Sequence, residues 1–328
     1  MRTRVLGRTG LPVSELGLGG LFLAADADTA DRSRATIAAA LAAGITYIDT
    51  APAYGDSERV IGASLSGHPG PVVLSTKLGA ADDPRRAQDP GELRASVERS
   101  LRRLRIDQID ILMLHEPDRP AQVPWWRSTV PLDGPVLGVV DQLKTEGKIR
   151  FTGLGGTTAY YLAHLCRTGL FDVVLTAFNY SLLWREAERE LLPAAAAAGM
   201  GVVIGAPFQQ GALARRWDRE VADGPWWLSA ARRAQFIALY RLLDDVGISV
   251  REAALRFVIS NPVVSSVVVG ARSPSEITEC ADLVEAGPLH PVLLQRLAEV
   301  AATVPYRPFD EPPILPFGMP YPGPGAMA

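Results

Sequence analysis

The sequence has very little cysteine and histidine. Its 328 residues include 2 cysteines and 4 histidines, whose spacing provides neither a disulfide framework nor a cluster of metal ligands. Cys166 and Cys280 each lie in a stretch of helical character, and isolated thiols of this kind are typical of a reducing compartment. We therefore expect a cytoplasmic protein without a metal site.

The sequence also lacks an excess of charge of one sign. Its 33 basic and 36 acidic residues are interleaved, so no basic surface that would bind nucleic acid or an anionic membrane is expected. No apolar run approaches the ~18 residues of a membrane span, and the opening MRTRVLGRTG has no apolar segment of the signal-peptide type. The expected partner is a small molecule, with no nucleic acid and no membrane involved.

Short apolar runs rich in Val, Ile and Leu alternate with longer stretches of helical periodicity, which predicts a parallel sheet built from strand-helix units. Eight such units in about 270 residues favour an α/β fold of the (β/α)8 TIM-barrel type over a doubly wound sheet. The expected strands are residues 16–20, 46–49, 72–76, 109–114, 149–154, 173–177, 202–205 and 264–269. The expected helices are residues 29–43, 57–66, 90–104, 135–146, 159–168, 187–198, a pair within 229–260, and 274–285.

Both ends of the chain lie outside this repeat. RTRVLGRTGLPVSELG predicts a β-hairpin with Thr9 and Gly10 in its turn, at the bottom of the barrel. Residues 304–328 contain too much proline for helix or sheet. We expect residues 1–303 to form the barrel and 304–328 to be an ordered tail on the barrel or on a neighbouring subunit, as a monomer or a homo-oligomer. The expected anchors of the tail are Tyr306, Phe309, Phe317 and Tyr321.

Two connections are longer than a barrel needs, and both follow predicted strands. Residues 116–135 contain Trp125 and Trp126, and residues 209–228 contain Trp217, Trp226 and Trp227. Loops in this position lie at the mouth where barrel enzymes act. The tryptophans are expected either to line a substrate site or to pack the loops against the barrel, and the two roles are compatible.

Four residues with acid-base chemistry stand at or just after the ends of predicted strands. Asp49 ends the second strand in GITYIDTAPAYGDSERVIG, Tyr54 follows it, Lys77 ends the third strand and His115 ends the fourth. The carboxyl ends of barrel strands meet at one face, so these side chains should share a cavity. A lysine cation held by Asp49 would favour the phenolate of Tyr54 and lower its pKa from about 10. His115 could direct a substrate carbonyl toward Tyr54.

Each of these residues also fits a structural role when it is taken alone. A hydrolase that used Asp49 and Glu58 as acid and base would leave Lys77 and His115 without a task. The sequence contains no metal-ligand spacing, nucleophile elbow or Walker loop, so the site needs a hydride partner. The best phosphate candidate is VVVGARSPSEI, in which Arg272 precedes a helix that begins with proline and whose free amides would face an anion.

The order, spacing and strand positions of Asp49, Tyr54, Lys77 and His115 resemble the catalytic tetrad of the aldo-keto reductase family, and the likeness extends from the hairpin to about residue 304. The resemblance implies hydride transfer from the nicotinamide of NADPH to an aldehyde or ketone, with Tyr54 as general acid and, in reverse, as base. It implies cofactor contacts at Gly20, Asp49, Gly155, Gly156, Ala177, Gly205, Ala206, Pro207, Phe208, Gln210, Gly211, Leu213, Gly270, Ala271, Arg272, Ser273, Glu276, Glu279 and Cys280. The substrate residues that we assign are Phe22, Tyr54, His115, Trp125, Trp126, Trp226 and Trp227.

The chain departs from the family pattern around the nicotinamide. Gly155 and Gly156 stand where many members have serine and asparagine, Ala177 stands in place of a glutamine, and Gly205 in place of a stacking aromatic residue. Phe208 or another loop aromatic is the expected substitute for that ring. Near the adenosine, Glu276 aligns with an arginine that contacts the 2'-phosphate, and Arg272 lies one helical turn away. NADPH is the favoured cofactor, and NADH remains open.

The segment GAPFQQGALA, with the glycines above, is similar to the branch of the family that includes aldose 1-dehydrogenases. The substrate is therefore expected to be a carbonyl compound or a sugar, as an aldose or lactol that is converted to a lactone. The alternative is a cofactor-binding regulatory protein with little turnover, like the β subunits of voltage-gated potassium channels that resemble this family.

Overall fold

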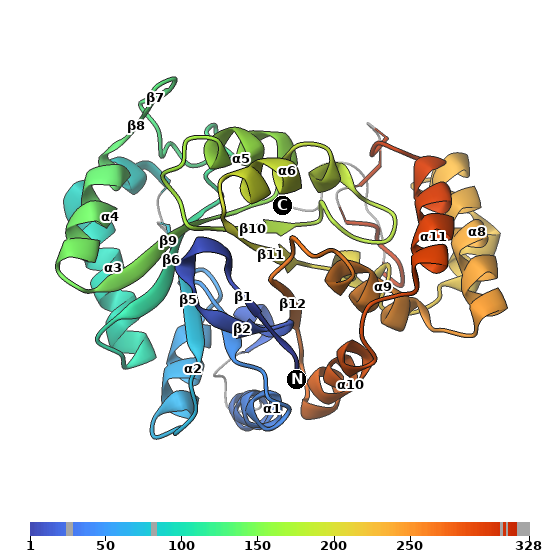
Figure 1. Cartoon of the computed structure of the whole chain (residues 1–328), viewed down its shortest axis with the longest axis horizontal. Coiled ribbons are helices and arrows are strands. Elements are labelled where there is room, and N and C mark those ends of the chain that lie inside the picture. The colour runs from blue at the N-terminus through green and yellow to red at the C-terminus, as the bar shows by residue number, and fades with distance from the viewer. Residues whose placement is uncertain (24–28, 80–83, 309–310, 313, 320–328) are drawn as a thin grey trace.

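The computed structural model describes residues 1–23, 29–79, 84–308, 311–312 and 314–319. Eight parallel strands close into a barrel in the order β10-β11-β12-β3-β4-β5-β6-β9, with helices around the outside (Figure 1). The barrel strands are β3 (Leu16–Gly19), β4 (Tyr47–Asp49), β5 (Val73–Leu78), β6 (Ile109–His115), β9 (Ile149–Gly156), β10 (Val173–Ala177), β11 (Gly201–Gly205) and β12 (Ser266–Gly270). Each overlaps an expected strand, so the predicted TIM barrel is confirmed.

The helices that were expected from periodicity are present, and four of them begin at a residue whose side chain caps the helix. Asp89 accepts hydrogen bonds from the backbone of Gly91 and Glu92 at the start of α3, and proline follows it. These helices are α1 (Ala30–Ala42), α2 (Ser57–Leu65), α3 (Pro90–Leu104), α4 (Pro135–Thr145), α5 (Ala159–Cys166), α6 (Leu191–Ala197), α8 (Ala230–Val246), α9 (Val250–Ile259) and α10 (Pro274–Glu285).

Three helical details differ from expectation. The helix expected over 187–198 is a short 3-10 turn, η4 (Glu186–Glu188), followed by α6 from Leu191. Two helices were not predicted, α7 (Asp218–Asp223) within a long loop and α11 (Pro291–Ala302) after the barrel. The side chain of His290 caps α11, and this helix lies against α8 (Figure 1). A strand-helix pattern does not predict α11, because no strand accompanies this helix.

The predicted N-terminal hairpin closes the lower end of the barrel. Strand β1 (Thr3–Val5) pairs antiparallel with β2 (Pro12–Ser14), and η1 (Gly7–Thr9) lies between them. Leu6, Leu11 and Val13 are buried with apolar side chains from the barrel interior, including Tyr47 and Ile111. This packing fills the lower end of the barrel, so the barrel has a solid core. A ligand can enter at the opposite end, where the carboxyl ends of the strands lie.

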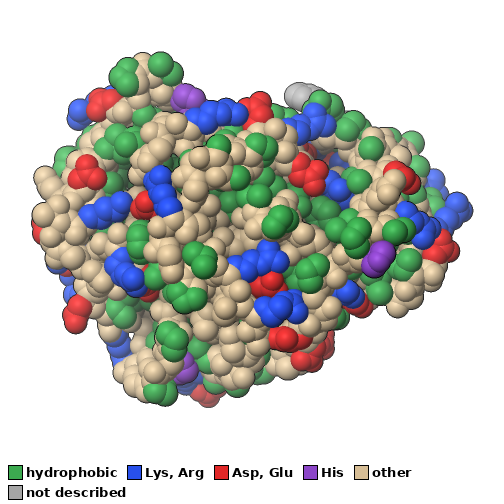
Figure 2. All heavy atoms as spheres, in the orientation of Figure 1, with side chains coloured by type: hydrophobic (Ala, Val, Ile, Leu, Met, Phe, Trp, Pro, Cys, Tyr) green, Lys and Arg blue, Asp and Glu red, His purple; other side chains and the backbone are tan. Residues whose placement is uncertain are grey.

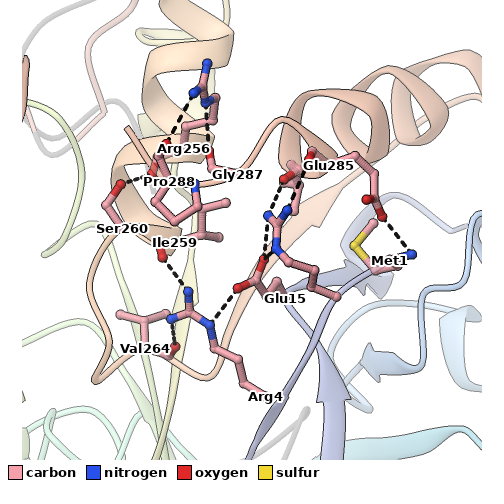
Figure 3. Close-up of polar contacts among 12 residues, drawn as sticks. Met1, Arg4, Glu15, Arg256, Ile259, Ser260, Val264, Glu285, Gly287 and Pro288 are labelled. Carbon is pink, nitrogen blue, oxygen red and sulfur yellow. Dashed lines mark hydrogen bonds and ion pairs between the residues drawn. The ribbon is translucent and has the colours of Figure 1, made fainter. Parts of the chain in front are cut away.

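An ion cluster fastens the hairpin to the last helices (Figure 3). The carboxylate of Glu15 accepts hydrogen bonds from Arg2 at 2.8 Å and from Arg4 at 2.7 Å. Arg4 also donates to the carbonyl oxygens of Ile259 and Val264, at and beyond the end of α9. Basic groups at a helix C-terminus satisfy carbonyls that the helix itself leaves unpaired. On the face of the molecule drawn in Figure 2, basic and acidic side chains are interleaved.

The described part of the C-terminal tail is held by one buried carboxylate. Glu311 accepts hydrogen bonds from Arg232 at 2.7 Å, from Arg307 at 3.2 Å and from the indole of Trp184 at 2.8 Å. Arg232 and Glu311 are almost completely buried, with side chains 1% and 2% exposed. Six residues further on, Phe317 inserts among aromatic rings. These rings are Trp217, Trp227 and Phe236.

Two of the four expected tail anchors can be assessed. Tyr306 lies under the guanidinium of Arg189 with 3.9 Å between the ring centroid and the Arg189 carbon, and Phe317 is buried. Phe309 and Tyr321 lie outside the described residues.

Two small strands, β7 (Ser128–Thr129) and β8 (Leu132–Asp133), form a hairpin in the first long loop. Among the described residues, no helix combines the length and apolar character needed to cross a membrane.

We predict that Glu311→Gln lowers the free energy of unfolding by about 3 kcal/mol or more, because the buried guanidinium of Arg232 loses its counter-charge. Urea unfolding followed by far-UV circular dichroism measures the change. Glu299, an exposed residue of α11, provides the matched control, and Glu299→Gln should change stability by less than about 0.5 kcal/mol. Equal stability of the two variants would contradict a structural role for the tail.

Candidate active site

The four predicted catalytic residues come together at the carboxyl ends of three neighbouring strands. Lys77 near the end of β5 donates hydrogen bonds to Asp49 Oδ2 at 2.6 Å and to the carbonyl of Thr50 at 2.8 Å. Its ammonium lies 4.8 Å from the ring centroid of Tyr54. The rings of Tyr54 and His115 are nearly perpendicular, with centroids 6.0 Å apart. The parallel pairing of β4, β5 and β6 therefore produces the juxtaposition expected from sequence.

The position of Asp49 is fixed from a second side. Ser75, its partner on β5, donates its hydroxyl to Asp49 Oδ1 at 2.6 Å, and the Ser75 oxygen lies 2.9 Å from the hydroxyl of Tyr47. Both carboxylate oxygens of Asp49 are thus engaged, one by the ammonium and one by a hydroxyl. A buried ion pair needs such additional hydrogen bonds, because both charges have lost their contact with water.

The same charges act on Lys77 and Tyr54 in different ways. Burial alone would lower the pKa of Lys77, but Asp49 and Tyr54 outweigh it and raise the pKa, so the amine stays protonated. Burial raises the pKa of Tyr54, and although the charge of Lys77 opposes this, the net shift is upward. The expectation that Lys77 lowers the pKa of Tyr54 is therefore corrected. The cation acts in the expected direction, but loss of water around the phenol is the larger effect.

His115 is held in its neutral form. Burial, followed by the charges of Lys77 and Arg119, lowers its pKa to about 3. A neutral imidazole carries one N–H donor and one acceptor nitrogen, and it can therefore donate a hydrogen bond without losing a charge. Tyr54 and His115 thus present two uncharged donors side by side, next to a fixed ammonium.

The tetrad lines a cavity of about 610 Å³. This volume lies within the range of about 300–1,000 Å³ that is usual for small-molecule sites. The predicted cofactor residues that line it are Gly20, Asp49, Gly155, Gly156, Ala177, Gly205, Ala206, Pro207, Phe208, Gln210, Gly211, Gly270, Arg272, Glu276 and Cys280. Of the predicted substrate residues, Phe22, Tyr54 and His115 also line the cavity.

Four predicted cofactor residues are not among those that line the cavity. Leu213 and Ala271 are buried in the apolar core. Ser273 accepts a hydrogen bond from the backbone of Glu276 and serves as the N-cap of α10. Glu279 forms an ion pair with Arg251, and it is Arg251 that lines the cavity.

None of the four predicted substrate tryptophans lines the cavity, which corrects their assignment as a substrate wall. Trp125 is completely buried and donates its indole N–H to the carbonyl of His115 at 3.0 Å. Trp126 donates to the carbonyl of Pro117 at 3.0 Å. Trp227 packs edge-on against Phe317 of the tail, and Trp226 is 70% exposed. Trp125 and Trp126 thus pack the first long loop against the barrel, which is the other role considered for the tryptophans, and Trp227 packs the second long loop against the tail.

The predicted phosphate end of the cavity combines an arginine with an aromatic ring. The guanidinium of Arg272 lies 4.1 Å from the ring centroid of Phe22. A Cβ atom added to Gly270 would lie 2.6 Å from that ring, so glycine at this position is needed for the ring to lie there. The carboxylate of Glu276 accepts a hydrogen bond from the backbone N–H of Arg272 at 2.7 Å. Phe22, predicted as a substrate residue, therefore also contacts the residue expected to bind phosphate.

Sequence reasoning missed several lining residues, among them Glu116, Phe178 and Arg251. Backbone strain marks this part of the cavity. Left-handed φ angles of 51°, 68°, 51° and 55° occur at Glu116, Phe178, Ala206 and Gln210. Such angles are uncommon outside glycine and cluster at functional sites. The sequence carries no signal for them, because none of the four is a glycine or an asparagine.

Fold and site together define an α/β-barrel oxidoreductase, and comparison with known proteins identifies the family. The model of the Aldo/keto reductase family matches residues 15–302, and the chain belongs to this family. A D-threo-aldose 1-dehydrogenase from Pseudomonas sp. is 31% identical, over 83% of this chain and 90% of that protein. An NADH-specific methylglyoxal reductase from Escherichia coli K12 is 29% identical, over 85% of this chain and 92% of that protein.

A solved structure supports the same family assignment. The holo form of aldo-keto reductase AKR11C1 from Bacillus halodurans superposes with a TM-score of 0.73 and 27% identity, covering 92% of this chain and 96% of that one. The protein is therefore a nicotinamide-dependent oxidoreductase that interconverts carbonyl compounds and alcohols. Its cavity fits such a cofactor, since the volume suffices and Arg251 and Arg272 offer positive charge to phosphate groups. Within the described ranges, no group of His, Cys, Asp or Glu side chains could hold a metal ion.

The lowered pKa predicts that His115 stays neutral across the physiological range. In a protein labelled with ¹⁵N-histidine, the ring signals of His115 should show no titration between about pH 5 and 8, where an unperturbed histidine gains its proton. The variant His115→Gln identifies these signals by their loss. A midpoint near pH 6.5 for His115 would show that the ring is more hydrated than the structure indicates.

Proposed function

We propose that Tyr54 donates the proton when this oxidoreductase reduces a carbonyl group, and accepts it when the enzyme oxidises an alcohol. The observation that supports this role best is the buried ion pair of Asp49 and Lys77 beside the phenol. In reduction the carbonyl oxygen receives the Tyr54 proton as the carbonyl carbon receives a hydride, and the phenolate that remains faces the Lys77 ammonium. A bound nicotinamide cofactor supplies that hydride, or accepts it in the reverse direction.

The other residues of the tetrad act through position and charge. Lys77 stabilises the phenolate form of Tyr54, which exists only after proton transfer, so its charge favours the transition state over the ground state. Asp49 keeps Lys77 charged and in place. Neutral His115 donates a hydrogen bond to the carbonyl oxygen and so orients it toward Tyr54. With the Tyr54 pKa raised, the phenol remains protonated at neutral pH and is ready to act as the acid.

We propose NADPH as the preferred cofactor. The guanidinium of Arg272 lines the cavity and is held over Phe22, whereas the Glu276 carboxylate is engaged by the Arg272 backbone N–H. An arginine at this end favours a 2'-phosphate, and a carboxylate favours a free ribose hydroxyl. NADH is the second candidate, because Glu276 also lines the cavity and one relative is named as NADH-specific.

We propose that the substrate is a small carbonyl compound or a sugar, taken as an aldose or lactol. The relative named D-threo-aldose 1-dehydrogenase and the polar groups around Tyr54 support this class.

The two cysteines are free and buried, which supports a cytoplasmic location. We propose that residues 1–303 form the barrel and that residues 304–328 are a tail packed on it. The contacts that Glu311 and Phe317 make with the barrel support this packing.

Tyr54→Phe should reduce turnover by about 10²- to 10⁴-fold, because the proton donor is lost while the ring that packs against His115 remains. Steady-state reduction of aldehydes by NADPH measures the loss, and NADPH titration followed by tryptophan fluorescence checks that cofactor binding persists. Tyr160→Phe, on the exposed side of α5, is the matched control. Undiminished turnover in Tyr54→Phe would refute the proton-donor role, whereas no turnover in the wild type would favour the regulatory alternative.

Arg272→Ala should raise the KM for NADPH by about tenfold or more and leave the KM for NADH nearly unchanged, since a charged hydrogen bond to the 2'-phosphate is lost. Initial rates with both cofactors at a fixed aldehyde concentration give the comparison. Arg241→Ala, an exposed arginine of α8, should affect neither. Equal increases for NADPH and NADH would sink the assignment of Arg272 to the 2'-phosphate.

A further inference from the structure

Glu116 is a carboxylate in the cavity for which the proposed proton transfer has no use. It follows His115 at the end of β6 and lines the cavity with its side chain 32% exposed. Its charge reaches the catalytic phenol. After burial, the largest cause, and Asp49, Glu116 also contributes to the raised pKa of Tyr54. The Glu116 carboxylate therefore lies where it can contact the substrate atoms next to the reacting carbonyl.

The backbone around Glu116 is fixed from both sides. Its φ of 51° is left-handed, which a residue with a side chain adopts at a cost and keeps only where the surroundings enforce it. Its N–H donates to the carbonyl of Gly155 at 2.7 Å. The indoles of Trp125 and Trp126 hold the carbonyls of His115 and Pro117, the residues before and after it. The two tryptophans thus fix the backbone that carries the Glu116 side chain relative to His115.

The carboxylate of Glu116 keeps free capacity to accept hydrogen bonds. Its ion pair with Arg119 is long, at 3.6 Å, and the guanidinium of Arg119 donates instead to Thr157 Oγ1 at 2.7 and 3.0 Å. The 3.6 Å contact is longer than a hydrogen bond, so it leaves the Glu116 oxygens able to accept others. An ionised carboxylate accepts two or more hydrogen bonds and can bind two neighbouring hydroxyl groups at once.

We propose that Glu116 determines substrate specificity by accepting hydrogen bonds from hydroxyl groups next to the reacting carbonyl, and that its charge excludes anionic carbonyl compounds. This inference rests on the proposed placement of the carbonyl between Tyr54 and His115. A carboxylate built to receive hydroxyl groups strongly disfavours an analogue that lacks them, because it is then left desolvated and unpaired. A substrate with its own carboxylate meets a like charge at close range in the cavity.

Two variants separate the hydrogen bonds from the charge. Glu116→Met keeps the length of the side chain and removes the acceptor, and Glu116→Gln keeps an acceptor and removes the charge. Both replacements are unbranched at Cβ, so they bear a similar backbone cost at a left-handed φ. Glu299→Met and Glu299→Gln on the exposed face of α11 are the matched controls.

The first assay compares glyceraldehyde with propanal, each reduced by the wild type and by Glu116→Met. The variant should lose about 30-fold in kcat/KM for glyceraldehyde and change by less than about threefold for propanal. Each ratio compares two enzymes on one substrate, so hydration of the aldehyde cancels. Equal losses on the two aldehydes would overturn the proposal, because they would show that Glu116 acts on both substrates alike, by holding His115 in place.

The second assay compares succinic semialdehyde with butanal in Glu116→Gln. Removing the negative charge should raise kcat/KM for the anionic aldehyde about tenfold relative to butanal. No gain would refute the exclusion of anions. If 3-aminopropanal is preferred over glyceraldehyde by the wild type, and this preference disappears in Glu116→Gln, the carboxylate recognises a cation and the hydroxyl proposal is wrong.

A binding measurement tests the role of Glu116 separately from the proposed role of Tyr54 in proton transfer. The cofactor-loaded protein is titrated with arabinitol and with 1-pentanol, which have five carbons each, and tryptophan fluorescence is followed. Arabinitol should bind at least about tenfold more weakly to Glu116→Met than to the wild type, with little change for 1-pentanol. An unchanged Kd for arabinitol overturns the inference whatever the turnover. Full turnover in Tyr54→Phe together with lost arabinitol binding in Glu116→Met would refute the role of Tyr54 and leave that of Glu116 standing.

Discussion

The buried ion pair of Asp49 and Lys77 is the interaction on which the site depends. A buried ammonium persists only when an opposite charge and hydrogen bonds replace its water, and Asp49, with Ser75 behind it, provides these. Burial and, after it, this fixed cation lower the pKa of His115 and keep it neutral, whereas at Tyr54 the cation opposes the effect of burial on the pKa. Burial therefore keeps both neighbours as uncharged donors in the resting enzyme, while the ion pair favours the phenolate that proton transfer would produce.

The closed barrel supplies the rigidity that this arrangement requires. Strands β4, β5 and β6 are adjacent and parallel, so their carboxyl ends place Asp49, Lys77 and His115, and Tyr54 lies in the short turn that follows β4. At the opposite end, the N-terminal hairpin fills the interior, and Arg2 and Arg4, both held by Glu15, tie it to the ends of α10 and α9 (Figure 3). The strained residues, such as Glu116 and Phe178, then stand on a frame that can hold unfavourable backbone angles in place.

The sequence predicts those features that depend on periodicity and on position along a strand. The eight strands and the tetrad follow from apolar runs and from the polar residue that ends each run. The direction of a loop side chain has no such signal, and Trp125 was therefore assigned to the substrate although it is buried beneath His115. The net shift of the Tyr54 pKa was missed for another reason. It is a difference between burial and charge, and only the charge of Lys77 is visible in the sequence.

Charge in the cavity is graded by depth, and the buried pair explains why. Asp49 neutralises Lys77 at the bottom, where an unpaired charge would be most costly. A second carboxylate at that depth would raise the pKa of Tyr54 further and hinder formation of the phenolate. Glu116, one third exposed and close to Arg119, is placed where water screens much of its effect on the phenol. It can still meet a ligand, because hydrogen bonds act at contact whereas its field on Tyr54 falls with distance. Acid-base chemistry and substrate selection are thus separated within one cavity by the depth of two carboxylates.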